Sequence, residues 1–337
     1  MESHILLLRP DRAGDAIKSL PAIRAYRREF PELKFSVLTS DHNASIFAHE
    51  PNIHVYSLPR DWRKLREDSW LSHMGLSSLF PAFQKIINLL ADPSPESLQL
   101  LSRIPAKEKY SAHPPQKQGL QLDPNISWVD FPKNSPAGRD ETSNAAWLLS
   151  QALWRDLSDK IEGEDRAPVL CEADQLEASE KMGRKTGEWI GFCPFANLHK
   201  RTPPLARWKR FFETVSQETR AERLFLFGTP ADYPALMELR SVAERRDRIE
   251  LCFPSSFRTL GAYLLRLDRV VAIDSGPLHL ARALGIPTLG FLSGGDAERW
   301  FPAKSDKDVI IPRGWLSRHP GPVQMLRAFR KWGSSAG

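Results

Sequence analysis

Short apolar runs alternate with amphipathic segments along both halves of the chain. In the first half, apolar runs at residues 4–8, 34–39 and 53–58 predict buried strands, and residues 16–29 between the first two predict a helix. The second half repeats the pattern, with predicted strands at 188–193, 223–228, 248–252, 269–273 and 287–292 and predicted helices at 207–219, 232–246, 256–265 and 277–285. Because strands that alternate with helices form parallel sheets covered by helices, we expect two α/β domains in tandem.

The middle of the chain departs from this pattern. Residues 91–145 hold many prolines, so we expect irregular excursions around one or two strands there, followed by a helix at about 142–157. The charged stretch from Ser158 to Arg166 then marks the predicted boundary between a first domain, 1–166, and a second domain, 167–318. The remaining segment, 319–337, contains a short amphipathic helix from Pro322 to Lys331.

Length and charge narrow the class of protein. The 337 residues are enough for two domains, and no apolar run approaches the length that spans a bilayer. The first apolar run, Ile5 to Leu8, is interrupted by Arg9, which does not fit a signal peptide, so we expect a cytoplasmic protein. The net charge of +6 suits phosphorylated partners, an anionic membrane surface or nucleic acid, although a solvated surface that happens to be basic also explains it.

Several kinds of site are not predicted by the sequence. The three cysteines and nine histidines show no metal-ligand spacing, so we expect no metal site. The chain has neither a Gly-x-Gly-x-x-Gly motif nor a P-loop, which argues against a nicotinamide dehydrogenase and a P-loop enzyme. We therefore expect no cofactor and no nucleic-acid partner.

A polar turn follows the predicted strand 269–273. It reads Asp274-Ser275-Gly276-Pro277-Leu278-His279 and leads at once into a helix. Proline suits a first helical turn, glycine allows close approach of a ligand, and free N–H groups at a helix start bind anions. An ordinary strand-to-helix cap explains the same residues, and this turn alone leaves the two interpretations equal.

A second polar turn follows the first predicted strand. Residues Arg9-Pro10-Asp11-Arg12-Ala13-Gly14-Asp15 lead from it into the helix at 16–29. The two turns together resemble glycosyltransferase family 9, the ADP-heptose:lipopolysaccharide heptosyltransferases. That family carries an Arg-x-Asp-Arg-x-Gly-Asp loop near its start and an Asp-Ser/Thr-Gly-Pro-x-His turn in its second half.

The resemblance extends to two further segments, one from Pro194 to Arg201 and one from Gly294 to Trp300. Residues 60–185 match only loosely. The sequence also departs from the family: Phe195 replaces a usual glycine, and Thr202-Pro203-Pro204 replaces Trp-Pro.

The resemblance implies a GT-B fold, in which two doubly wound Rossmann-like domains face a cleft. The first domain would bind the acceptor, the second would bind the nucleotide sugar, and the helix of 319–337 would return to the first domain. Asp15 would be the catalytic base that deprotonates the acceptor hydroxyl. The alternative is that Asp15 caps the following helix.

The donor would be held mainly by the second domain. Lys200 and Arg201 would neutralise the diphosphate, and Asp232 would take a ribose hydroxyl unless it is a helix cap. The Asp274 turn would hold a phosphate on its backbone, with His279 on the same phosphate or the sugar. Residues expected to position the loops are Arg9, Asp11, Arg12, Gly14, Asp296 and Arg299.

We therefore predict an inverting, metal-independent glycosyltransferase that moves a heptose or related sugar from an ADP-linked donor to a lipopolysaccharide-core or similar acceptor. Basic clusters at Arg60–Arg66 and in the C-terminal helix allow a peripheral contact with the inner face of the cytoplasmic membrane. Two alternatives stay open: another GT-B glycosyltransferase with a different donor and a non-lipid acceptor, and an inactive nucleotide-binding or scaffold relative.

Overall fold

The chain consists of two compact units, Met1–Val169 and Leu170–Gly337, and each is described by itself. The division lies close to the boundary expected after residue 166. The computed structural model describes residues 4–59, 62, 83–114, 121–131, 140–161, 166–196, 202–292, 309–311 and 319–334.

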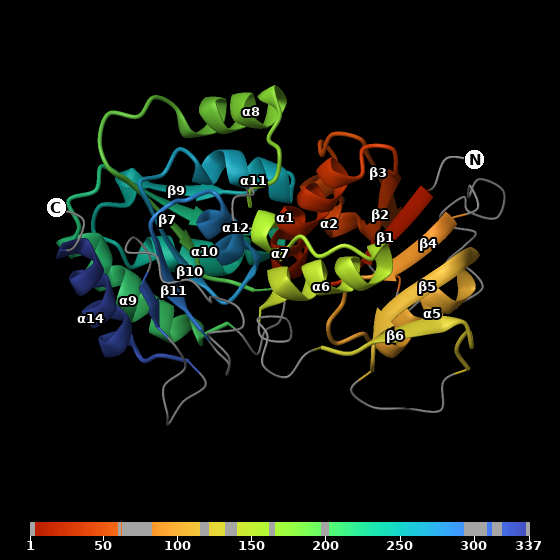
Figure 1. Ribbon diagram of the computed structural model, residues 1–337. Helices are drawn as coiled ribbons and strands as arrows, with labels where there is room; N and C mark the ends of the chain where they lie inside the picture. Colours follow the sequence, from red (N-terminus) through yellow and green to blue (C-terminus); the bar gives the residue numbers. More distant parts are fainter. Residues whose placement is uncertain are drawn as a thin grey trace. The chain divides into compact units, whose positions relative to one another are not determined.

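The first unit is built around a parallel sheet. Its strands are β1 (His4–Arg9), β2 (Lys34–Ser40), β3 (Ile53–Leu58), β4 (Phe83–Asn88), β5 (Ala106–Ala112) and β6 (Ile126–Val129), in the spatial order β3-β2-β1-β4-β5-β6. Its helices are α1 (Ala13–Glu29), α2 (Asp41–Phe47), α5 (Pro95–Arg103), α6 (Glu141–Leu153) and α7 (Ser158–Ile161). Residues Ile5 to Leu8 of β1 are buried, as expected for a central parallel strand covered on both faces. Helices α1 and α6 lie side by side (Figure 1).

The second unit repeats this architecture. Its strands are β7 (Trp189–Cys193), β8 (Arg223–Phe227), β9 (Ile249–Cys252), β10 (Arg269–Ile273), β11 (Thr288–Phe291) and β12 (Val309–Ile311), in the order β12-β11-β10-β7-β8-β9. The described helices are α8 (Glu172–Met182), α9 (Leu205–Glu218), α10 (Tyr233–Ser241), α11 (Phe257–Leu264), α12 (Gly276–Ala283) and α14 (Pro322–Ser334), with 3-10 turns η3 (Pro230–Asp232) and η4 (Arg246–Arg248). None of the described helices is both long and apolar enough to cross a bilayer.

Both sheets have the strand order of the Rossmann fold, in which the strand order reverses between the first and fourth strands, so that later strands are added on the opposite side of the first. In the first unit this switch point lies between β1 and β4, and in the second between β7 and β10. Ligands of such sheets bind beyond the carboxyl ends of the strands at the switch point. The segment starting at Arg9 begins at the last residue of β1, and those starting at Pro194 and Asp274 follow β7 and β10, so all three lie at a switch point.

The C-terminal helix packs within the second unit. Helix α14 lies beside α9 and contacts β11 and β12, all in the second unit (Figure 1). Its apolar face is buried in the core of that unit through Met325, Ala328, Phe329 and Trp332. The resemblance implied that the helix of 319–337 returns to the first domain, and the structure shows that the apolar face of its described part is buried within the second unit.

The proline-rich middle is more regular than expected. Helix α5 starts with Pro95 in its first turn and is capped by Ser94, whose hydroxyl accepts from the N–H of Ser97 at 3.3 Å. Proline is tolerated there because the first N–H groups of a helix have no partner within it. The helix expected at 142–157 ends earlier, at Leu153, where Trp154 takes a left-handed conformation with φ of 55°.

Candidate active site

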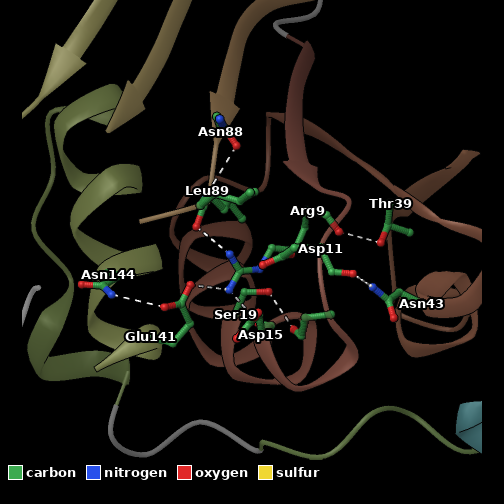
Figure 2. A network of polar contacts seen from close by, with 12 residues as sticks. Arg9, Asp11, Asp15, Ser19, Thr39, Asn43, Asn88, Leu89, Glu141 and Asn144 are labelled. Carbon is green, nitrogen blue, oxygen red and sulfur yellow. Dashed lines mark hydrogen bonds and ion pairs between the residues drawn. The ribbon is translucent and has the colours of Figure 1, made fainter. Parts of the chain in front are cut away.

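A buried guanidinium organises the switch point of the first unit. Arg9, the last residue of β1, is fully buried, and its Nη1 donates to the carbonyl of Leu89 at 2.7 Å, just beyond β4. Its Nη2 donates to the main-chain carbonyl of Asp15 at 2.8 Å and to Oε1 of Glu141 at 2.7 Å. Arg9 thus ties β1, β4, α1 and α6 together at the carboxyl edge of the sheet (Figure 2).

The loop between β1 and α1 is fixed at both ends. Thr39, near the end of β2, donates its hydroxyl to the carbonyl of Arg9 at 2.7 Å, and Asn43 of α2 donates to the carbonyl of Asp11 at 2.8 Å. The Asp11 carboxylate lies 3.5 Å from Nε of Arg9. The loop-positioning role predicted for Arg9 and Asp11 therefore has direct contacts, whereas Arg12 is the exposed N-cap residue of α1 and makes no side-chain cap bond.

Asp15 lies in the first turn of α1, next to the buried Gly14, and is 7% exposed. The N-cap of this helix is Arg12, so Asp15 does not occupy the capping position that the alternative interpretation required. Burial, the nearby Asp11 carboxylate and Glu141 raise the pKa of Asp15 well above its ordinary value, against the lowering effect of Arg9. A carboxylate with a raised pKa is a stronger base than an ordinary aspartate and is suited to accept a proton during a reaction.

Glu141 and Asn144 are members of this network that the sequence did not point to. Both come from α6 and are buried, and the side-chain amide of Asn144 donates to Oε2 of Glu141 at 3.3 Å. The Arg9–Glu141 pair joins residues 132 positions apart. The carboxylates of Asp11, Glu141 and Asp15 hold Arg9 charged and raise its pKa, although burial alone would lower it.

The switch point of the second unit carries the other polar turn. Asp274 follows β10, is 6% exposed, and donates its N–H to the carbonyl of Phe291 at 3.0 Å. Ser275 is the N-cap of α12, and its hydroxyl donates back to the carbonyl of Ile273 at 3.0 Å. Gly276 opens the helix, Pro277 lies in its first turn, and the N–H of Leu278 bonds to the carbonyl of Ser275 at 3.1 Å.

His279 is the fourth residue of α12 and is 8% exposed. Asp274 and Ser275 therefore lie just before, and His279 just after, the first turn of a helix that begins at the carboxyl edge of the sheet. The positive end of the helix dipole lies there, which is the electrostatic requirement for an anion site.

Asp232 is the third residue of the 3-10 turn η3 and bonds back to Thr229, the N-cap residue of that turn. Its Oδ2 accepts from the N–H of Thr229 at 2.8 Å and from the Thr229 hydroxyl at 2.7 Å, which stabilises the turn after β8. Asp232 therefore belongs to a capping box around η3, whose N-cap is Thr229, whereas as the N-cap residue of α10 its side chain makes no cap bond. The contact with a ribose stays a prediction.

Four predicted site residues, Lys200, Arg201, Asp296 and Arg299, lie outside the described residues. The ends of the first of these segments are described: the N–H of Ala196 donates to the hydroxyl of Thr202 at 3.1 Å. Phe195, which replaces the family's glycine, packs against the core of the second unit.

Within the described ranges no three His, Cys, Asp or Glu side chains are grouped so as to hold a metal ion.

Two Rossmann-like parallel sheets, each with a polar turn at its switch point, define a GT-B type of glycosyltransferase fold. The model of glycosyltransferase family 9 (heptosyltransferase) matches residues 149–317. The chain belongs to glycosyltransferase family 9 and is a glycosyltransferase.

Solved structures share the fold along nearly the whole chain. A family 9 glycosyltransferase from Veillonella parvula has a TM-score of 0.75 at 15% identity, with 98% of this chain and 97% of that chain covered. E. coli heptosyltransferase WaaC with ADP-2-deoxy-2-fluoro heptose has a TM-score of 0.69 at 14% identity, with 99% and 100% covered. E. coli ADP-heptose LPS heptosyltransferase II has a TM-score of 0.69 at 17% identity, with 98% of each covered. The sequence itself matches no curated protein.

Proposed function

We propose that this enzyme transfers a heptose, with inversion, from an ADP-linked donor to a lipopolysaccharide-core or similar glycan acceptor. Membership of the heptosyltransferase family supports the sugar. The fold it shares with WaaC, whose structures contain ADP and an ADP-heptose analogue, supports the donor.

Asp15 is the proposed general base. It accepts the proton of the acceptor hydroxyl as that oxygen forms a bond to the anomeric carbon of the sugar. The bond from the anomeric carbon to the diphosphate breaks at the same time, and ADP leaves with the electron pair. Because attack and departure occur on opposite faces of the ring, the anomeric configuration inverts.

The leaving diphosphate gains negative charge, which must be stabilised. We assign this task to the start of α12, from Ser275 to Leu278, together with Lys200 and Arg201. Backbone N–H groups and the helix dipole can supply part of the stabilisation without a divalent cation.

The observation that carries the proposal is Asp15 itself. It is a buried carboxylate in the first turn of α1, with a raised pKa, and a fully buried Arg9 fixes the backbone beside it. A helix surface without catalytic use rarely keeps such an arrangement, because burying several ionisable groups is costly.

The donor is tested by incubating the enzyme with ADP-heptose, or with UDP- and GDP-linked sugars, and truncated lipopolysaccharide-core acceptors. Mass spectrometry should find one added heptose per acceptor with ADP-heptose alone, and chelator should not prevent it. Transfer of a sugar from a UDP- or GDP-linked donor instead would contradict the ADP-linked donor of this proposal. ADP binding with no transfer to any acceptor would favour the inactive relative.

A membrane-bound acceptor would bring the enzyme to an anionic surface, so we extend the proposal to peripheral membrane contact. Arg327 and Arg330 of α14 are exposed, although Arg330 is already paired with Glu218 at its side. Sedimentation with anionic vesicles should show binding at low salt that weakens as salt rises. Absence of binding at low salt would contradict this extension.

A further inference from the structure

Glu141 is a buried carboxylate to which the proposed reaction gives no task. It starts α6, and its side chain is 4% exposed. One oxygen accepts from Arg9 at 2.7 Å and the other accepts from Asn144 at 3.3 Å (Figure 2). Removing a carboxylate this completely from water costs several kcal/mol unless its partners compensate, so its place in the network calls for an explanation.

The same nitrogen of Arg9 connects Glu141 to the first turn of α1. Nη2 donates both to Glu141 and to the main-chain carbonyl of Asp15, while Nη1 is held by the carbonyl of Leu89. A planar guanidinium has a fixed fork of donors, so three such contacts define its position. The position of Glu141 is therefore transmitted to the backbone of Asp15 through one rigid group.

Among the described residues, three charged side chains lie closest to Asp15: Arg9 from β1, Asp11 from the following loop and Glu141 from α6. The neighbouring elements add little to this set. Helix α2 contributes the neutral Asn43, and its Asp41 and His42 are exposed. Asp140, before α6, is bound to Thr142 and Ser143. Helix α7 carries Asp159 and Lys160, and Lys160 pairs with Glu29 at the far end of α1, about 20 Å along the helix axis.

We propose that Glu141 is a positioning residue for Asp15: its ion pair with Arg9 holds the first turn of α1 and keeps the Asp15 carboxylate available as a proton acceptor. The inference rests on the proposed role of Asp15 as the base.

The physical reason is competition for one cation. A carboxylate beside an uncompensated guanidinium has a lowered pKa and is a weak base. Glu141 supplies a negative charge at 2.7 Å from Arg9, which offsets the cation. Its charge acts with burial and with Asp11 to raise the pKa of Asp15.

The test follows the Asp15 carboxyl by NMR in protein labelled with [γ-13C]aspartate, with the Asp15→Asn variant identifying the signal. In Glu141→Gln, which conserves volume and an acceptor for Arg9, the titration midpoint should fall by about one pH unit. The acid limb of the transfer rate should move in the same direction. A merely structural role would lower stability and leave both midpoints in place.

Two matched variants control the experiment. Asp140→Asn removes the same charge one residue earlier and keeps the helix cap, so it should leave the midpoint unchanged. Glu141→Asp keeps the charge and should retain a midpoint near that of the wild type while lowering kcat.

If Glu141→Gln does not fold, Arg9→Gln is compared with the double variant Arg9→Gln/Glu141→Gln, whose midpoint should be the lower of the two. An unchanged midpoint in these comparisons, with Asp15→Asn inactive, would overturn this inference and leave the proposed function standing. A fully active Asp15→Asn variant would overturn the proposed function itself.

Discussion

Replacing Arg9 by methionine should strongly destabilise the first unit. The substitution conserves most of the volume but removes the donors to Leu89, Asp15 and Glu141, at 2.7, 2.8 and 2.7 Å. It leaves Glu141, only 4% exposed, as a buried carboxylate without its cation. Breaking a buried ion pair on one side costs about 3–5 kcal/mol.

That cost is a large part of the stability of a domain, which is typically about 5–15 kcal/mol. Hydrogen exchange of the β1 and β4 amides measures it, and their slowest rates should rise about a hundred-fold to a few-thousand-fold. Strands β7 and β10 of the second unit provide an internal control.

The double variant Arg9→Met/Glu141→Leu tests the reasoning further. Replacing both buried charges by apolar side chains is often neutral or stabilising, so exchange in β1 should return close to the wild-type rate. The double variant should nevertheless lack transfer activity, because the main-chain carbonyl of Asp15 has lost its bond to Arg9. A loss below about 1 kcal/mol in Arg9→Met, or no recovery in the double variant, would refute the buried-pair argument.

Other substitutions separate stability from function. Because the folded pKa of Asp15 is raised, its contribution to stability is complete below the ordinary pKa of an aspartate, about 4, and is lost as the pH rises through the raised value. Asp15→Asn should therefore raise the melting temperature at neutral pH but not below pH 4, and equal melting curves at both pH values would contradict this sign. Asp232→Ala should lower the free energy of unfolding of the second unit by about 1 kcal/mol in urea denaturation, and Asp232→Asn by much less, because the asparagine amide oxygen can accept the same bonds from Thr229; equal losses would exclude a contribution from this capping box. Phe329→Ala should cost about 3–5 kcal/mol, seen as faster exchange in α9 and β11, whereas a response confined to the first unit would contradict the packing of α14.

The strands could be predicted where burial on both faces leaves a continuous apolar run. Ile5 to Leu8 in β1 and Val270 to Ile273 in β10 are such runs, and both are buried. Strand β4 has no such signal, because Gln84 and Lys85 interrupt its apolar run. Lys85 forms an ion pair with Glu108 of β5, which exists only once the two strands are neighbours in the folded sheet. The sequence alone therefore could not predict that a lysine is tolerated in this strand.

The two polar turns could be predicted because each lies within one short segment. Glu141 could not, since its partner Arg9 is 132 positions away and nothing local distinguishes it from other acidic residues at helix starts. Helix α14 shows the same limit: its sequence predicts an apolar face but not the surface that covers it. The resemblance pointed to the first domain, whereas the residues pack into the second.

The measurement that tests the central claim most directly is the transfer rate of Asp15→Asn with ADP-heptose and a lipopolysaccharide-core acceptor. Asparagine keeps the shape of the side chain but cannot accept the proton, so kcat should fall by roughly 10²–10⁴-fold while the affinity for ADP stays unchanged. Circular dichroism and the melting temperature would verify that the variant is folded. Transfer at the wild-type rate by folded Asp15→Asn would contradict the claim that this residue is the catalytic base.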